Sequence, residues 1–185
     1  MKKLAKPLGS IQPEYDYVII GSGYGGSISA SRMARAGQSV CLFEKGVMQD
    51  EMWPLPIRQD LASFEEGVNR AWEMLKPNPY PENKNGYPVL KKTEAMRKSA
   101  DYMSAHFGLL DINVNFENKI NHVGVEQPKC TNCGDCVTGC NVGAKNTTAM
   151  NYLPDAFNHG ADIFTSINVR YVKKFKSHWQ VYYHP

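Results

Sequence analysis

The chain has 185 residues, of which 42% are hydrophobic and 21% are charged, a balance typical of a soluble globular protein of one domain or slightly more. Its formal net charge of +3 comes with no run of five or more like charges, so charge gives no indication of a nucleic-acid partner. The N-terminus lacks an apolar segment of signal-peptide length, and no stretch approaches the roughly 18 apolar residues of a transmembrane helix, so we expect a cytoplasmic protein.

The first recognisable unit is the stretch 15–46, YDYVIIGSGYGGSISASRMARAGQSVCLFEKG. Its apolar start predicts a strand over residues 17–20, which runs directly into glycines. Small residues over 27–36 favour a helix packed close to a sheet, and residues 39–43 predict a second strand. This order of strand, glycines, helix and strand is typical of a dinucleotide-binding βαβ unit.

Four residues of this unit are candidate cofactor-binding positions. Gly21, Gly23 and Gly26 have the G-x-G-x-x-G spacing, which permits a tight turn, approach of a pyrophosphate to the backbone, and close contact between helix and strand. The helix N-terminus adds unpaired N–H groups for an anion. Glu44, about twenty residues further on, can accept hydrogen bonds from a ribose, and its charge disfavours the 2′-phosphate of NADP.

The middle of the chain is predicted to be mostly scaffold. Residues 47–56 are expected to cross the surface, and apolar residues at helical spacing predict a helix over 58–75, with its apolar stripe in the core. Prolines and asparagines indicate a loop over 76–88. A second helix is expected over 92–107, with its apolar residues facing inward: Ala95, Met96, Ala100, Met103 and Phe107.

The C-terminal part returns to a regular pattern. A helix capped by Thr147 or Thr148 is expected to end near His159, followed by a strand over 162–165. Residues 169–175 and 179–183 predict a β-hairpin. A helix followed by a strand can extend the parallel sheet begun upstream, so the predicted fold is α/β, a partial Rossmann-type FAD-binding domain with a helical excursion and a cysteine-rich loop.

Four of the five cysteines lie in the segment KCTNCGDCVTGCNVGAK. Cys130, Cys133, Cys136 and Cys140 have the spacing C-x2-C-x2-C-x3-C of bacterial-type ferredoxins. In that arrangement the fourth cysteine serves a second cluster, and this chain has no second run of cysteines. Cys41 lies in an apolar strand, where a small buried thiol is the simpler explanation.

Three interpretations of the cysteine run therefore stay open. The thiolates could hold one four-iron cluster, form a zinc or other tetrahedral thiolate site, or belong to a structural or partly disulfide-bonded turn. A zinc site would normally show two C-x-x-C pairs separated by a longer loop, which is absent here. The sequence makes these four cysteines candidate metal ligands and leaves open whether they bind iron, zinc or no metal.

Taken together, these motifs resemble the glucose-methanol-choline (GMC) oxidoreductases, most closely their cholesterol-oxidase-like and long-chain alcohol-oxidising branch. The resemblance rests on three stretches in the same order: the glycine fingerprint, then PNPYP with LKKTEAMRKSA, and finally CTNCGDCVTGCNVGAKNTTAMNYLPDAFNHGADI. In this branch the cysteine run is described as ferredoxin-like. The resemblance implies FAD as cofactor and an alcohol or sterol as substrate, and it places Val169 where the family meets the adenine.

The chain departs from that family in two places. The segment after Val47 is much shorter than the family's flavin-covering motif, and the chain ends before the substrate domain and the catalytic histidine. His178 and His184 do not fit that role by context, so no catalytic residue is assigned. We therefore expect an internally shortened N-terminal fragment of a flavoenzyme.

The predicted organisation has four parts: an FAD fingerprint over 14–46, a helical insertion over 47–128, a cysteine-rich segment over 129–145 and a continuation of the FAD domain over 146–185. Two alternatives to a flavoenzyme fragment stay open. The chain could be an iron-sulfur electron-transfer module with its own protein partner, or an inactive fragment.

Overall fold

The computed structural model describes residues 4–45, 61–84 and 86–184. The predicted surface segment 47–56 and the predicted start of the first long helix at residue 58 lie outside these residues. A short 3-10 turn, η1 (Leu8–Ser10), precedes the first strand.

A three-stranded parallel sheet forms the centre of the fold. Its strands are β1 (Tyr17–Ile20), β2 (Val40–Phe43) and β7 (Asp162–Phe164), in the spatial order β1-β2-β7. All pairs are parallel, with Ile20 opposite Phe43 and Phe43 opposite Phe164. The third strand is thus supplied by the C-terminal part of the chain, and the predicted α/β class is confirmed.

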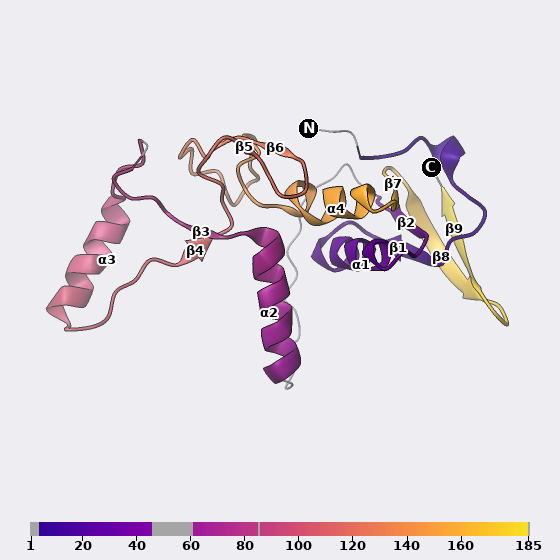
Figure 1. The fold of residues 1–185 in the computed structure, drawn as a ribbon, viewed down its shortest axis with the longest axis horizontal. Coiled ribbons are helices and arrows are strands. Elements are labelled where there is room, and N and C mark those ends of the chain that lie inside the picture. Colours follow the sequence, from indigo (N-terminus) through magenta and orange to yellow (C-terminus); the bar gives the residue numbers. More distant parts are fainter. Residues whose placement is uncertain (1–3, 46–60, 85, 185) are drawn as a thin grey trace.

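Two helices cover one face of this sheet: α1 (Tyr24–Arg35) and α4 (Tyr152–Asn158). They pack against each other and against the sheet, as Figure 1 shows. Small residues on α1 make the close approach possible, because Ala30 and Ala34 are buried between the layers. The core on this side is aliphatic and includes Leu4, Val40, Leu42, Leu153, Ala156 and Ile163.

A buried carboxylate joins these two helices. Asp155 on α4 accepts hydrogen bonds from Ser31 and from Arg35 on α1, with 2.8 Å between Arg35 Nε and the carboxylate. Burial alone would raise the pKa of Asp155, but the bonds from Arg35 and Ser31 hold it below its usual value. The carboxylate is therefore charged and paired inside the helix interface.

Helix α4 begins differently from the prediction. Thr147 makes no side-chain capping bond, and Thr148–Met150 forms a 3-10 turn, η2. Asn151 caps α4, since its side chain accepts a hydrogen bond from the N–H of Tyr152 at 2.7 Å. Pro154 therefore falls in the first turn, where a missing N–H costs nothing.

The predicted hairpin is confirmed as β8 (Asn168–Lys174) paired with β9 (Trp179–His184). Its base covers the other face of the sheet, where Val169 and Val181 pack against a cluster that contains Cys41, Phe43, Phe164 and Ile167. The rings of Phe43 and Tyr183 lie 4.9 Å apart. The far end of the hairpin extends beyond the sheet (Figure 1).

The first long helix is α2 (Leu61–Leu75), and its predicted burial is wrong over most of its length. Within the described part of the chain it packs at its C-terminal end, through Met74 and Leu75, against Val123, Val125, Met150 and Tyr152. Phe64, Val68 and Trp72 form an exposed apolar stripe instead. In Figure 1 the helix projects away from the sheet, and no other described element lies along it.

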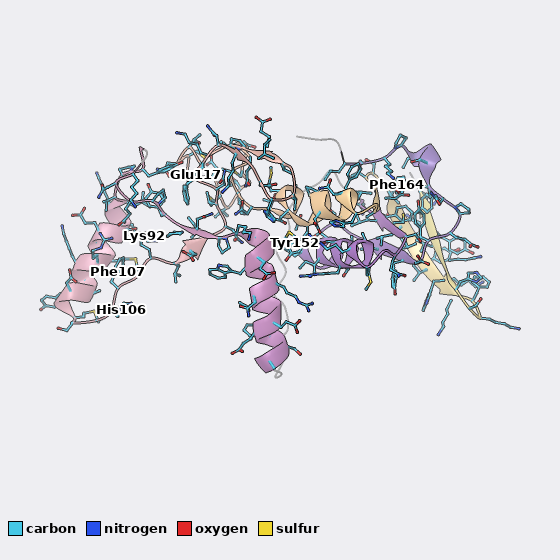
Figure 2. The ribbon with its side chains drawn as sticks, viewed as in Figure 1. Lys92, His106, Phe107, Glu117, Tyr152 and Phe164 are labelled. Atoms are coloured by element: carbon cyan, nitrogen blue, oxygen red, sulfur yellow. The ribbon has the colours of Figure 1, made fainter. Side chains whose placement is uncertain are left out.

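The second long helix, α3 (Lys91–Tyr102), is shorter than predicted and has no buried residue. It ends because Ser104 adopts a left-handed backbone, with φ of 52°, so Phe107 lies outside it. Met96 and Met103, predicted to face inward, are exposed. Figure 2 shows Lys92, His106 and Phe107 at the opposite end of the molecule from Phe164.

Three short pairings organise the region that the sequence left unplaced. Strand β3 (Asn78–Pro79) pairs with β4 (Asp111–Ile112), and β5 (Lys119–Ile120) pairs with β6 (Glu126–Gln127). Val114 bridges to Lys145, which ties the cysteine-rich segment to this region. Among the described helices none has the length and apolarity needed to cross a membrane.

Candidate functional site

The glycine turn after β1 has the conformation that the fingerprint predicts. Gly21 adopts a φ of 95°, in the left-handed region that favours glycine, and its N–H donates to the Phe43 carbonyl at 2.7 Å. An added Cβ on Gly26 would lie 2.0 Å from the Gly21 carbonyl oxygen. Only a glycine at position 26 therefore lets α1 pack this closely against the turn.

Gly23 occupies a different kind of place. It is the N-cap of α1 with a φ of −59°, and an added Cβ there would meet no other protein atom within 4 Å. The first turn of α1 carries no acidic residue. Open space and the positive end of a twelve-residue helix are what a pyrophosphate requires.

Glu44 lies at the same edge of the sheet as the glycine turn. Its carboxylate accepts hydrogen bonds from the N–H of Ser22 at 2.7 Å and from the Ser22 hydroxyl at 2.8 Å. Its backbone is fixed by Phe164 and Ile167, each through a bond of 2.8 Å. Ser22 was not among the predicted site residues, although a short hydroxyl side chain between the first two glycines is a usable signal.

Val169 lies near this edge as well. It follows Ile167, whose N–H donates to the Glu44 carbonyl, and it packs against the cluster around Phe43. The five residues predicted for FAD thus belong to one neighbourhood at the carboxyl ends of β1, β2 and β7. Ligands bind at this edge in open α/β sheets.

The geometry fits the adenosine diphosphate part of a dinucleotide. The turn at Gly21, the close contact at Gly26, the open space at Gly23 and the carboxylate of Glu44 each supply one element of such a site.

The four clustered cysteines lie around one small cavity of about 20 Å³. Their thiols are free; those of Cys133 and Cys136 are exposed, and those of Cys130 and Cys140 are partly buried. No group of three or more Cys, His, Asp or Glu side chains within the described residues is placed to hold a metal ion. The fold therefore brings the four thiols to one cavity without forming a ready ligand set for the predicted cluster.

Cys140 has the most polarised environment of this segment. Burial on its own raises the pKa of the thiol, but the backbone N–H groups of residues 142–145 turn toward the sulfur and lower the pKa below its ordinary value. Cys130 receives a weaker contact from the N–H of Asn132 at 3.4 Å. Such N–H groups stabilise a thiolate or a sulfur bound to a metal.

A larger cavity of about 300 Å³, which the sequence did not reveal, lies between the end of α2, β5 and η2. Its walls carry an amide network. Asn146 donates to the Leu75 carbonyl at 2.7 Å and accepts from Gln127 at 2.6 Å, and Asn121 donates to the Met150 carbonyl at 2.6 Å. The bond from Asn146 ties the C-terminal end of α2 to this network.

The two histidines near the C-terminus lie in the hairpin and are exposed. The ring of His178 stacks on Phe175 at 5.4 Å, in the turn between β8 and β9.

Comparison with known proteins adds a family relationship. Residues 113–177, about a third of the chain, match the model described as GMC oxidoreductase. A long-chain-alcohol oxidase of Arabidopsis thaliana is 25% identical, over 82% of this chain and 26% of its own length. A cholesterol oxidase of Acinetobacter baumannii is 43% identical over 53 residues, which cover 29% of this chain and 10% of that enzyme. The chain thus spans about a quarter or less of these relatives.

Among solved structures, L-amino acid deaminase from Proteus vulgaris is 12% identical with a TM-score of 0.46, covering 97% of this chain and 46% of the deaminase. NikD, an amino acid oxidase, is 14% identical with the same TM-score, covering 91% of this chain and 47% of that protein. Because these TM-scores are below 0.5, we base the fold assignment on the strand order of the chain itself.

Proposed function

We propose, from the match of residues 113–177 to the GMC oxidoreductase model, that the βαβ unit of this chain forms the adenine-nucleotide part of an FAD site. The observation that carries the proposal is the glycine turn, in which Gly26 packs against the Gly21 carbonyl while Gly23 faces open space. Gly23 and the N-terminus of α1 would hold the pyrophosphate, Glu44 the ribose, and Val169 the adenine.

The enzyme class follows as a proposal from the relatives. Their names indicate oxidation of long-chain alcohols and cholesterol, so we assign an alcohol or sterol as the substrate class of the whole protein. FAD, when bound, supplies the acceptor for hydride from the carbon that bears the hydroxyl. Nucleotide binding is the role that we assign to the described residues, and we assign none of them to proton transfer.

The proposed organisation keeps the four predicted parts. Residues 14–46 and 146–185 together form the nucleotide-binding body, and their shared sheet supports this grouping. Residues 47–128 form the helical insertion and residues 129–145 the cysteine-rich segment. A cytoplasmic location remains part of the same proposal.

Flavin binding tests the proposal directly. FAD titrated into the purified chain should quench or polarise flavin fluorescence, and Gly23→Ala should weaken binding at least about tenfold, or about 1.4 kcal/mol. The new methyl group meets no protein atom, so stability should be unchanged. Gly67→Ala, on the exposed part of α2, is the matched control. Equal affinity of Gly23→Ala and the control would refute the site, and no binding by any form would favour the inactive fragment.

A second candidate function is an electron-transfer module built on the cysteine run. It is favoured by one observation: the four thiols border one cavity, with backbone N–H groups directed at Cys140. A four-iron cluster there would require the turn around Cys133 and Cys136 to rearrange, because those thiols are not in a metal-binding arrangement.

The absorption spectrum and the metal and flavin content of protein purified without oxygen distinguish these candidates. A broad absorption near 400 nm, with about four irons and acid-labile sulfide per chain and their loss in Cys133→Ser, would support the cluster and its electron-transfer partner. Stoichiometric zinc would support the tetrahedral thiolate site. Flavin without metal would leave the cysteines structural.

A further inference from the structure

The positive charge of the chain is concentrated in the β8–β9 hairpin. Residues 168–184 contain four basic residues and no acidic one, whereas the rest of the chain holds 17 basic and 18 acidic residues. The four cations are Arg170, Lys173, Lys174 and Lys176. The hairpin therefore accounts for the net positive charge of the chain. Its basic residues do not form a run of five or more like charges, so a search for such runs does not find them.

The distal half of the same hairpin is also unusually apolar for an exposed element. Every residue from 170 to 180 is exposed, and four of them are large and hydrophobic: Tyr171, Val172, Phe175 and Trp179. Trp179 alone is 61% exposed. Figure 1 shows this end of β8 and β9 projecting beyond the sheet and its helices. We take these exposed apolar side chains at a projecting end as the sign of an interaction site.

Cations accompany the aromatic rings at the tip. The Lys173 ammonium lies 5.2 Å from the ring centre of Phe175, and that of Lys174 lies 5.7 Å from Trp179. Long basic side chains beside aromatic rings are the arrangement found at a membrane interface, where rings sit at headgroup level and ammonium groups reach the phosphates.

The ring faces distinguish a lipid surface from single-stranded nucleic acid. Tyr171 stacks on Tyr182 at 4.3 Å with an interplanar angle of 19°, and Phe175 stacks on His178 at 5.4 Å with an angle of 6°. Bases bind by stacking on free aromatic faces. Here one face of each of these rings is already in contact with a neighbouring ring, while insertion among lipid headgroups needs only apolar surface.

We infer that the distal half of the β8–β9 hairpin is a docking surface for an anionic lipid bilayer. The base of the hairpin is anchored to the sheet by Val169, Val181 and Tyr183, so docking would orient the whole nucleotide-binding body at the membrane. The inference goes beyond the proposed flavin site and does not depend on flavin binding.

Co-sedimentation with vesicles tests this surface. The full chain should bind vesicles of phosphatidylcholine with one third phosphatidylglycerol, bind pure phosphatidylcholine weakly, and dissociate from the anionic vesicles as salt is raised. The triple variant Lys173→Gln, Lys174→Gln, Lys176→Gln should reduce partitioning about a hundredfold. Trp179→Ala should weaken binding at every salt concentration, because it removes apolar rather than charged surface.

A matched triple variant removes the same charge elsewhere: Lys91→Gln, Lys92→Gln, Lys129→Gln, all at exposed positions. It should bind vesicles as the parent does. Failure of the parent to bind anionic vesicles, or equal losses in both triple variants, would overturn the inference. Hairpin-dependent binding of a single-stranded oligonucleotide without vesicle binding would overturn it too. Since no flavin is present in these measurements, their outcome is separate from that of the FAD titration.

Discussion

The Glu44 carboxylate accepts two hydrogen bonds from a single residue, Ser22, one from its backbone N–H at 2.7 Å and one from its hydroxyl at 2.8 Å. This contact ties the end of β2 to the glycine turn that follows β1. It holds an acidic side chain beside the place where α1 begins, which is where a ribose and a pyrophosphate would meet.

Ser22→Ala should lower the free energy of unfolding by about 1 kcal/mol, since one of the two bonds to a charged acceptor is lost. Glu44→Gln should weaken FAD binding more than Ser22→Ala does, because it changes the group proposed to contact the ribose. Urea unfolding and FAD titration of both single variants and the double variant measure the coupling. If the loss of stability in the double variant equals the sum of the losses in the two single variants, the Ser22 hydroxyl and the Glu44 carboxylate are not coupled.

Gly26→Ala should destabilise the fold by about 3 kcal/mol or more, because the added Cβ would overlap the Gly21 carbonyl oxygen and force the backbone apart. Thermal unfolding measures this change. Gly23→Ala and Gly67→Ala should keep the parental melting temperature or exceed it, since neither methyl group meets another atom. A parental melting temperature for Gly26→Ala would contradict the close packing of α1 on the turn.

Asp155 should make stability depend on acidic pH. Its folded-state pKa is lowered, so its contribution is fully present above the unfolded-state pKa of about 3.9 and is lost as pH falls through the folded value. Asp155→Asn should cost about 2 kcal/mol at neutral pH and flatten the decline below about pH 4. Urea unfolding at several pH values measures both effects.

The control for this prediction is Glu94→Gln. Glu94 pairs with Lys98 on the exposed surface of α3, at 3.0 Å, and such pairs contribute little to stability. Its stability profile should follow that of the parent. The same acid dependence in the parent and in Asp155→Asn would exclude Asp155 as its source.

Cys41 should be the unreactive thiol of the native protein. It is fully buried in β2, and burial raises its pKa to about 12. Four thiols should therefore react with Ellman's reagent under native conditions and the fifth only after denaturation. Cys41→Ala should remove the slow thiol. Rapid native reaction of all five would contradict the packing of β2 between the two layers.

The elements around the glycine turn were predictable because their signals are local. Strands at 17–20 and 162–165, the hairpin near the C-terminus and the direction of the sheet all follow from apolar runs and turn residues within a few positions. The start of α4 was not, since Asn151 rather than a threonine provides the cap.

The helices of the insertion show the limit of periodicity. The apolar stripe of α2 predicted a buried face, yet Phe64, Val68 and Trp72 are exposed, because a stripe records the capacity to be buried and not the presence of a covering element. Figure 2 shows the same for α3, whose side chains stand clear of Tyr152 and Phe164, residues of two separate hydrophobic clusters. Only the placement of distant segments could reveal this.

The sequence by itself determined the glycine spacing, the acid at the end of the second strand and the four cysteines within eleven positions, since these are properties of neighbouring residues. The tertiary structure alone decided that Ser22 binds Glu44, that Asp155 joins α1 to α4, and that the four thiols share a cavity without a metal-binding arrangement. These relationships join residues 22 to 120 or more positions apart, or depend on side-chain directions, and no local pattern fixes either.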